Sequence, residues 1–103
     1  MGYKILHSVP AELDFDSIIH YITVSLNNPA AARNLRDEYY EKLAMLKESP
    51  CLYSAAPIEE LARSGYHRFS FGNYIAFYQI NDEEQKVNII RIFYKRQDYI
   101  NML

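Results

Sequence analysis

Three stretches in the C-terminal third of the chain are rich in aromatic and β-branched residues, and short polar segments separate them. They run from Tyr66 to Phe71, from Tyr74 to Ile80 and from Lys86 to Tyr94. Tyr, Phe, Ile and Val favour a pleated, half-buried surface, so each stretch is predicted to be a β-strand.

The two connections between these strands are short enough to be hairpins. Gly72-Asn73 is a two-residue connection, and its leading glycine suits a type II′ turn because glycine tolerates a positive φ. The segment Asn81 to Gln85 is polar and typical of a turn. Consecutive strands joined by hairpins run antiparallel, so the pattern predicts an antiparallel meander.

The N-terminal half begins with a short strand candidate and then changes to a helical period. Tyr3 to His7 is the strand candidate, and Pro10 suits the first turn of a helix because its missing amide would have no intrahelical partner there. This helix is predicted to end near Asn27. One apolar stripe with spacings of three and four residues is predicted to face a core, and its members are Phe15, Ile18, Ile19, Ile22 and Leu26.

A second helix follows almost at once. Asn28 suits the N-cap and Pro29 the first helical position, and the run from Ala30 to Lys47 continues the helix. Ser49-Pro50 is predicted to end it, because proline disfavours helical geometry in the residue before it. The two helices therefore form an αα-hairpin. The predicted buried face of the second helix consists of Leu35, Tyr39, Leu43 and Leu46.

The order of elements predicts an α+β fold with two layers. Residues 51–64 show little pattern, although a short helix from Pro57 to Arg63, closed by Ser64-Gly65, would fit them. The order strand-helix-helix-strand-strand-strand favours an antiparallel sheet with the N-terminal helical hairpin packed on one face. With 103 residues, 50% of them hydrophobic, we expect a single domain, 1–103.

Charge and composition narrow the classes of function. The formal net charge is −2, whereas general nucleic-acid binders usually carry a basic surplus, so direct DNA contact is not expected. The single cysteine, Cys51, cannot form an internal disulfide, and no apolar run reaches the roughly 20 residues of a membrane span. Together with the lack of a secretory apolar region, these features predict a cytoplasmic protein.

The candidate chemistry lies where the last predicted strand ends. There the sequence Tyr94-Lys95-Arg96-Gln97-Asp98-Tyr99 gathers cations and phenols, which suits an anionic partner. Arg91 lies inside an apolar strand, so we expect it to pair with a carboxylate of a helix. His7 and His20 lack neighbours at metal-ligand spacing, and there is no Gly-rich phosphate loop, so neither a metal nor a cofactor is expected.

Several fragments, in this order and spacing, resemble toxins of the RelE/ParE superfamily of bacterial type II toxin-antitoxin modules, a group that includes plasmid-stabilisation proteins. The resemblance runs nearly from end to end. The fragments are Ala11-Glu12-Leu13-Asp14, Ile18-Ile19-His20-Tyr21-Ile22, Asn28-Pro29-Ala30-Ala31-Ala32, Leu46-Lys47-Glu48-Ser49-Pro50, Gly65-Tyr66-His67-Arg68, Tyr74-Ile75-Ala76-Phe77-Tyr78-Gln79-Ile80 and Ile89-Ile90-Arg91-Ile92-Phe93-Tyr94-Lys95-Arg96-Gln97-Asp98-Tyr99.

The resemblance implies two alternative activities. RelE-like members cut mRNA in the ribosomal A site, which requires a proton acceptor for the ribose hydroxyl, cations for the transition state and an acid for the leaving oxygen. Arg68, Arg96 and Tyr99 fall where such members carry active-site groups, and would be the catalytic residues. His67 adjoins Arg68, but neighbouring strand residues point to opposite faces, so at most one of the two belongs to a site.

The other activity is that of ParE-like members, which poison DNA gyrase by binding it. Ribonuclease members resemble one another in placing an arginine after the tyrosine that starts the second predicted strand of the meander, and here Ile75 follows Tyr74. An isoleucine cannot hold a phosphate, so a toxin that binds its target is favoured. Whether the protein is an enzyme stays open, as does a third reading, a non-toxic protein-interaction module. The target-binding residues would be Arg68, Tyr94, Lys95, Arg96 and Tyr99.

The resemblance also implies a partner. Toxins of this superfamily are held inactive by a cognate antitoxin, whose C-terminal segment binds as a helix or adds a strand to the sheet. The expected landing surfaces are the exposed face of the helical hairpin and the groove beside the last strand. The other expected partner is the target, either DNA gyrase or the ribosome with its mRNA.

Overall fold

The computed structural model describes residues 2–50 and 65–95 of the chain. The predicted order of elements and the α+β class are confirmed. The short helix that the sequence suggests from Pro57 to Arg63 lies outside the described residues. In chain order the elements are β1 (Lys4–His7), α1 (Val9–His20), the π-helical segment η1 (Tyr21–Ser25), α2 (Pro29–Glu48), β2 (His67–Phe71), β3 (Tyr74–Asn81) and β4 (Lys86–Tyr94).

The four strands form one sheet in the order β1-β4-β3-β2. The β2–β3 and β3–β4 pairs are antiparallel, which confirms the meander. β1 instead pairs in parallel with β4, with Lys4 opposite Lys86 and His7 opposite Ile89, so the sheet is mixed rather than antiparallel throughout. The hairpin argument constrains only strands that follow one another in the chain, and it could not set the direction of β1.

The turn between β2 and β3 has the predicted geometry. Gly72 has a φ of +56°, and Asn73 is not among the residues with a positive φ. A positive φ at the first central residue alone distinguishes a type II′ turn from a type I′ turn. The β3–β4 hairpin needs one left-handed residue as well, which is Gln85 with a φ of +53°.

Both helices begin at side-chain caps. The Ala11 N–H donates to Ser8 Oγ at 3.1 Å at the start of α1, and the Ala31 N–H donates to Asn28 Oδ1 at 3.1 Å at the start of α2. Proline lies in the first turn of each helix, as predicted. α1 starts at Val9, one residue earlier than the sequence suggests, because Ser8 supplies the cap.

The first helix ends in a π-helical turn, and this changes where its last apolar residue points. The Leu26 N–H donates to the Tyr21 carbonyl at 3.0 Å, a bond that spans five residues. A π-turn holds more residues than an α-helical turn, so it rotates the following side chain away from the stripe that a 3.6-residue period predicts. Leu26 is therefore 54% exposed, and its predicted place in the core is wrong, whereas Ile22 is buried. Asn27, with a φ of +49°, then turns the chain into α2.

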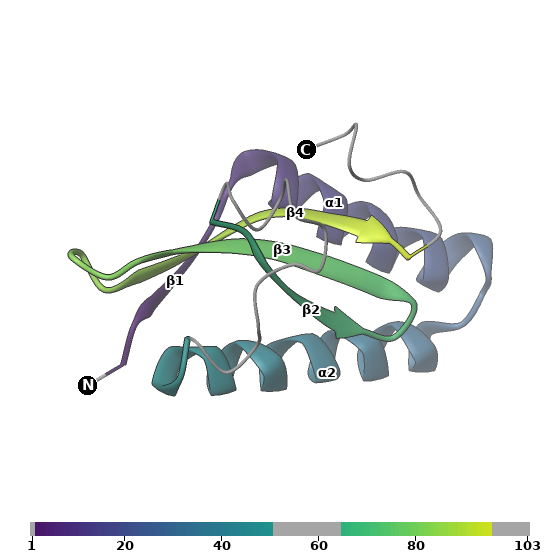
Figure 1. Cartoon of the computed structure of the whole chain (residues 1–103). Coiled ribbons are helices and arrows are strands. Elements are labelled where there is room, and N and C mark those ends of the chain that lie inside the picture. The colour runs from purple at the N-terminus through teal and green to yellow at the C-terminus, as the bar shows by residue number, and fades with distance from the viewer. Residues whose placement is uncertain (1, 51–64, 96–103) are drawn as a thin grey trace.

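The two helices pack against one face of the sheet, as Figure 1 shows. Tyr39 lies at the centre of this contact and is 1% exposed, with its ring centroid 4.6 Å from that of Phe15 and 4.7 Å from that of Phe71. Burial of such aromatic rings supplies much of the hydrophobic stabilisation. The other buried members of this core are Ala11, Leu43, Leu46, Phe69, Ala76, Tyr78, Val87, Ile89 and Ile92.

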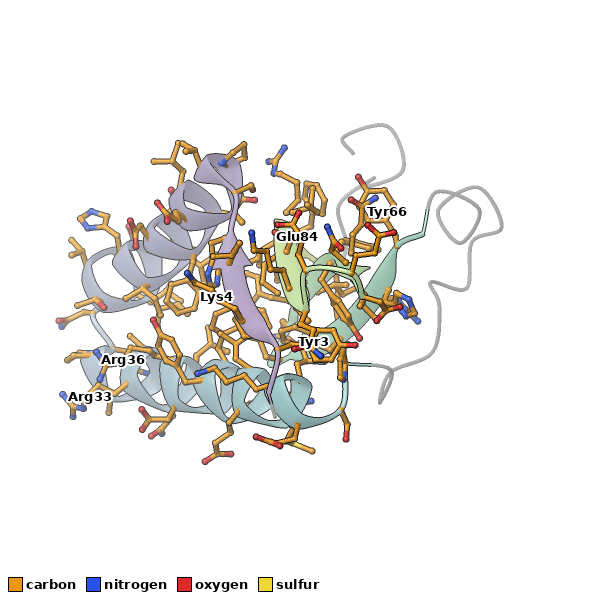
Figure 2. The ribbon with its side chains drawn as sticks, turned by 90° about the vertical axis from the view of Figure 1, so that its left-hand side faces the viewer. Tyr3, Lys4, Arg33, Arg36, Tyr66 and Glu84 are labelled. Atoms are coloured by element: carbon orange, nitrogen blue, oxygen red, sulfur yellow. The ribbon has the colours of Figure 1, made fainter. Side chains whose placement is uncertain are left out.

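The predicted inner face of α2 agrees with this core. Tyr39, Leu43 and Leu46 are buried, and Leu35 is partly buried against them. Figure 2 shows the helices on one side of the strands, with Tyr66 on the other side and with Arg33 and Arg36 at one end of α2.

A β-bulge in β4 decides which of its side chains face the helices. Phe77 is in register with Arg91, but the next residue, Tyr78, is in register with Ile89, so Ile90 has no opposite residue. Without the bulge, Ile89 and Arg91 would point to the same face because they are two residues apart. With it, Ile89 joins the core and Arg91 points to the other face.

Candidate binding site

Arg68 lies in β2 on the face of the sheet that is turned away from the helices. It is in register with Phe77 of β3, which is in register with Arg91 of β4. The three side chains therefore form one row across this face. Tyr66, two residues before Arg68, meets Phe77 edge-on, with ring centroids 6.3 Å apart. This face thus carries two arginines and a phenol around an aromatic ring.

His67 does not belong to that row. Its ring stacks on Tyr78, a member of the core beneath the helices, with centroids 5.4 Å apart. The prediction that His67 and Arg68 point to opposite faces is confirmed.

Tyr94 and Lys95 lie at the end of β4. Tyr94 is in register with Tyr74, which is in register with the core residue Phe71, so Tyr94 points to the helix side of the sheet. Arg68 is three residues from Phe71 and points the opposite way. Lys95 is exposed, and its N–H donates to the Asn73 carbonyl at 2.9 Å.

The structure therefore brings together only some of the predicted site residues. Tyr94 and Lys95 are adjacent, while Arg68 lies on another face. Arg96 and Tyr99 lie outside the described residues.

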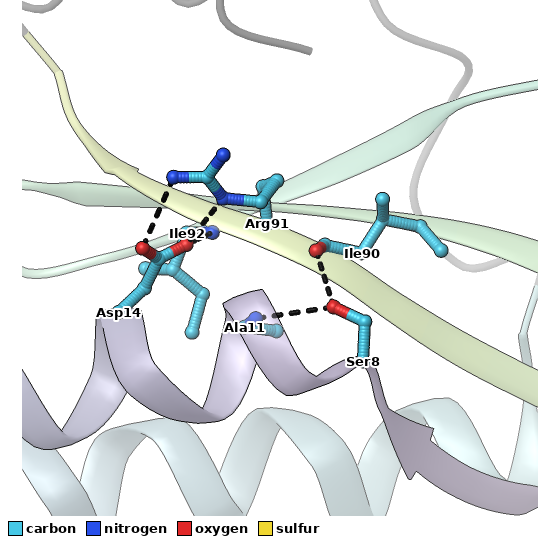
Figure 3. Close-up of polar contacts among 6 residues, drawn as sticks. All are labelled: Ser8, Ala11, Asp14, Ile90, Arg91 and Ile92. Carbon is cyan, nitrogen blue, oxygen red and sulfur yellow. Dashed lines mark hydrogen bonds and ion pairs between the residues drawn. The ribbon is translucent and has the colours of Figure 1, made fainter.

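Arg91 pairs with a helix carboxylate, as predicted, and the partner is Asp14 of α1 (Figure 3). The Arg91 Nε–H donates to Asp14 Oδ2 at 2.8 Å, and an η-nitrogen donates to Oδ1 at 3.2 Å. These hydrogen bonds favour the charged guanidinium and raise the pKa of Arg91 above its ordinary value, against the smaller opposing effect of burial. The guanidinium also lies 4.8 Å from the centre of the Phe93 ring, so it is held on two sides.

α1 also completes the edge of β4 that β1 leaves open. β1 pairs with β4 only as far as Ile89. Beyond that point Ser8 Oγ donates to the Ile90 carbonyl at 2.6 Å, and the Ile92 N–H donates to Asp14 Oδ2 at 2.9 Å (Figure 3). Backbone groups at a sheet edge need partners. Side chains from the start of α1 supply them, and this fixes the helix against the last strand.

A groove of about 840 Å³ lies next to Asp14, between the first helix with η1, the start of α2, the β2–β3 turn and the end of β4. Its lining is mostly apolar and includes Leu35, Tyr74 and three exposed side chains. Those three are Tyr21, 50% exposed, Leu26, 54% exposed, and Tyr94, 38% exposed. A mostly apolar hollow with a few polar groups is typical of a site that binds another molecule.

Three phenols meet in this groove. The rings of Tyr74 and Tyr94 are 5.6 Å apart at a steep angle. Burial raises the pKa of Tyr74, and the nearby Tyr94 and Tyr21 raise it further, because ionised phenols would repel one another. Tyr74 therefore stays neutral at physiological pH. It presents apolar ring surface and a hydroxyl that can donate or accept a hydrogen bond.

Among the described residues, no group of three or more His, Cys, Asp and Glu side chains could hold a metal ion. His20 is exposed, and His7 hydrogen-bonds to Tyr39. None of the helices in residues 2–50 and 65–95 is both long enough and apolar enough to cross a membrane.

The sequence prediction did not include Tyr21, Tyr74 or Asp14 among the site residues, although all three line the groove. Asp14 had a detectable signal, because it follows Ala11 by three residues and precedes Ile18 by four, which places an acid on the inner stripe of the helix. The two tyrosines had none, because Tyr21 follows the first helix and Tyr74 lies in β3, and only the packing of these elements brings them to one groove.

Comparison with known proteins agrees with this fold. The model of the family described as ParE toxin of type II toxin-antitoxin system, parDE, matches residues 5–99. A search of curated protein sequences gave no match.

Three solved structures similar to this chain represent both branches of the superfamily. The chromosomal ParDE system from P. aeruginosa has a TM-score of 0.66 and 18% identity, covering 89% of this chain and 95% of that chain. A double mutant of E. coli toxin RelE in the free state has a TM-score of 0.67 and 15% identity, covering 99% and 93%. The RelBE2 toxin-antitoxin complex from Mycobacterium tuberculosis has a TM-score of 0.61 and 18% identity, covering 91% and 99%.

At these identities the structural likeness establishes the fold alone. The family match is more specific, because it spans nearly the whole chain. The chain therefore belongs to the ParE toxin family of type II toxin-antitoxin systems, within the RelE/ParE superfamily.

Proposed function

We propose that this protein is a cytoplasmic toxin that arrests growth by binding DNA gyrase, and that a cognate antitoxin neutralises it. Membership of the ParE toxin family supports the role as a toxin. The structural relatives do not separate gyrase from the ribosome as the target, because they include both ParDE and RelE proteins. The choice of target is argued from the side chains of this chain.

The choice of gyrase over the ribosome rests on the residue at position 75, which is an isoleucine. The position that holds an arginine in ribonuclease members is here an aliphatic side chain, only 4% exposed. A phosphoryl-transfer transition state gains negative charge and needs cations close by. Arg91 is already engaged by Asp14. Binding of gyrase requires a complementary surface and no proton transfer, so these residues suit it better than catalysis.

A RelE-like ribonuclease is the second candidate, and one observation favours it. Arg68 and Tyr66 share the open face of the sheet, and a cation with a phenol is a combination that RNA cleavage could use. Arg96 and Tyr99 would complete such a site as the further catalytic residues. The protein would then be an endoribonuclease that cuts mRNA.

The antitoxin is proposed to bind in the groove lined by Tyr21, Tyr74 and Tyr94. The groove beside the last strand is one of the two landing surfaces expected from the family resemblance. Its apolar lining and its exposed Leu26 suit the apolar side of a helix or an extended segment. Exposed apolar surface of this kind is normally covered by a partner.

Induction of the chain alone in a bacterial host tests the target. The proposal expects growth arrest, loss of negative supercoiling in a reporter plasmid, and intact translated mRNAs. Cleavage of mRNAs on the ribosome with unchanged plasmid topology would establish the ribonuclease instead. Normal growth would leave only a non-toxic interaction module.

A pair of variants tests the antitoxin site. Leu26→Asp places a charge in the groove, and we expect it to stay toxic but to escape neutralisation by the co-expressed antitoxin. Val9→Asp is the matched control, because Val9 is 69% exposed and does not line the groove. Equal neutralisation of both variants would contradict the proposed site.

A further inference from the structure

The Tyr39 hydroxyl is buried beneath the helices and has one hydrogen-bond partner among the described residues. The residue is 1% exposed, and its oxygen lies 2.7 Å from Nε2 of His7, on β1. The Tyr39 ring packs against the rings of Phe15, Phe69 and Phe71. The bond therefore joins the first strand to the middle of α2.

This bond requires a neutral imidazole if the phenol is to be the donor. His7 then accepts at Nε2 and carries its own proton on Nδ1. A protonated imidazole has N–H groups at both positions and cannot accept. The charged ring can only donate from Nε2 to the Tyr39 oxygen, and the Tyr39 hydroxyl proton loses the one acceptor that the described residues give it. A buried donor without an acceptor is destabilising.

The groups around His7 do not cancel this effect. Burial lowers the pKa of His7, and the smaller attraction of Glu12 for the charged ring raises it. On β4 the residue in register with His7 is Ile89, which does not titrate. A cavity of about 240 Å³ brings the ring close to acids from α1 and phenols from α2, and the titratable groups lining it with His7 are Glu12, Asp16, Tyr39 and Tyr40. Arg36 of α2 lines the neighbouring cavity with Asp16 and Tyr40.

We propose that His7 and Tyr39 form a pH-sensitive latch, which holds β1 and the start of α1 against α2 while the imidazole is neutral and loosens when it is protonated. The next residue, Ser8, caps α1 and bonds the Ile90 carbonyl of β4. A shift of His7 therefore reaches the contact between the first helix and the last strand.

The direction of the pH effect follows from the lowered pKa. The unfolded chain takes up the proton near the ordinary value of 6.5, and the folded chain does so at a lower pH. The stabilisation is complete above the unfolded value and is lost as the pH falls through the folded value. Below both values, the folding equilibrium constant drops about tenfold for each unit of pKa difference.

NMR titration of the full chain, made by cell-free synthesis, tests the latch. We expect the His7 ring to titrate below 6.5, and to titrate at a higher pH in Tyr39→Phe, because the neutral ring then loses its donor. Urea unfolding at pH 7.5 and 5.0 should show a fall in stability that His7→Gln reduces and that His20→Gln, at an exposed position of α1, leaves unchanged.

Two results would overturn the latch. One is a His7 ring in the unaltered protein that titrates at or above 6.5. The other is a His7→Gln variant whose stability falls with pH as much as that of the parent. If His7→Gln does not fold, the titration of the unaltered protein alone decides.

Discussion

The carboxylate of Asp14 accepts three hydrogen bonds, two from Arg91 and one from the backbone of Ile92. Its side chain is 18% exposed and that of Arg91 is 28% exposed, so solvent weakens the pair only in part. We expect Asp14→Asn to lower the free energy of unfolding by about 1–3 kcal/mol, measured by urea denaturation. The control is Asp16→Asn, at an exposed acid of the same helix, which should change it by less than about 0.5 kcal/mol. Similar losses in both variants would contradict this role.

A second prediction at the residue scale concerns the two described glycines with a positive φ. Gly72 has a φ of +56°, and a Cβ there would lie 2.6 Å from Leu35 Cδ1, whereas Gly65 has a φ of +80° and open space around it. An alanine at either position is strained by about 1–3 kcal/mol, and the contact with Leu35 adds to this only at position 72. Gly72→Ala should therefore lower the unfolding temperature more than Gly65→Ala does. Equal shifts of the unfolding temperature would contradict this prediction, because they would mean that the Leu35 side chain moves aside without loss of stability.

The sequence predicted the role of Arg91 but not its partner. A charge in an apolar strand needs a counter-charge, whatever the position of that strand in the fold. Which acid provides it depends on the bulge at Ile90, which turns Arg91 to the face away from the core, and on the position of α1 beside β4. Neither is encoded in local spacing.

At the scale of elements, Ser8 connects two structures, because its hydroxyl accepts from the Ala11 N–H and donates to the Ile90 carbonyl. Among the described residues, the side chain of Asn28 makes only the cap of α2. We expect Asn28→Ala to cost about 1 kcal/mol and Ser8→Ala clearly more, because Ser8→Ala also leaves the Ile90 carbonyl without its partner. Chemical denaturation of the two variants compares them directly. A Ser8→Ala loss no larger than that of Asn28→Ala would show that the bond to β4 adds nothing.

Local signals predicted the elements themselves and failed where backbone geometry or distant pairing decides. Gly72-Asn73 and Asn28-Pro29 specify a turn and a helix start in a few residues, and both predictions hold. The exposure of Leu26 follows from a π-turn that periodicity does not reveal. The parallel direction of β1 depends on its pairing with β4, which is distant in the sequence, so local patterns do not reveal it.

At the scale of the whole molecule, the proposed binding surfaces lie on different sides of the sheet. Tyr94 borders the groove on the helix side, and Arg68 lies on the open face. Within the proposed function, an antitoxin in the groove contacts Tyr94, which is also a predicted target-binding residue, whereas Arg68 lies on the opposite face. The sequence predicted site residues near the end of β4. The structure shows that Tyr21 and Tyr74 line the same groove as Tyr94.

The supercoiling activity of purified DNA gyrase, measured on a relaxed plasmid with the toxin added, tests the proposed function most directly. A toxin that acts by binding gyrase should abolish supercoiling at near-equimolar amounts and should not cut a translated mRNA. Unchanged supercoiling at a tenfold molar excess, together with cleavage of mRNA on programmed ribosomes, would contradict it.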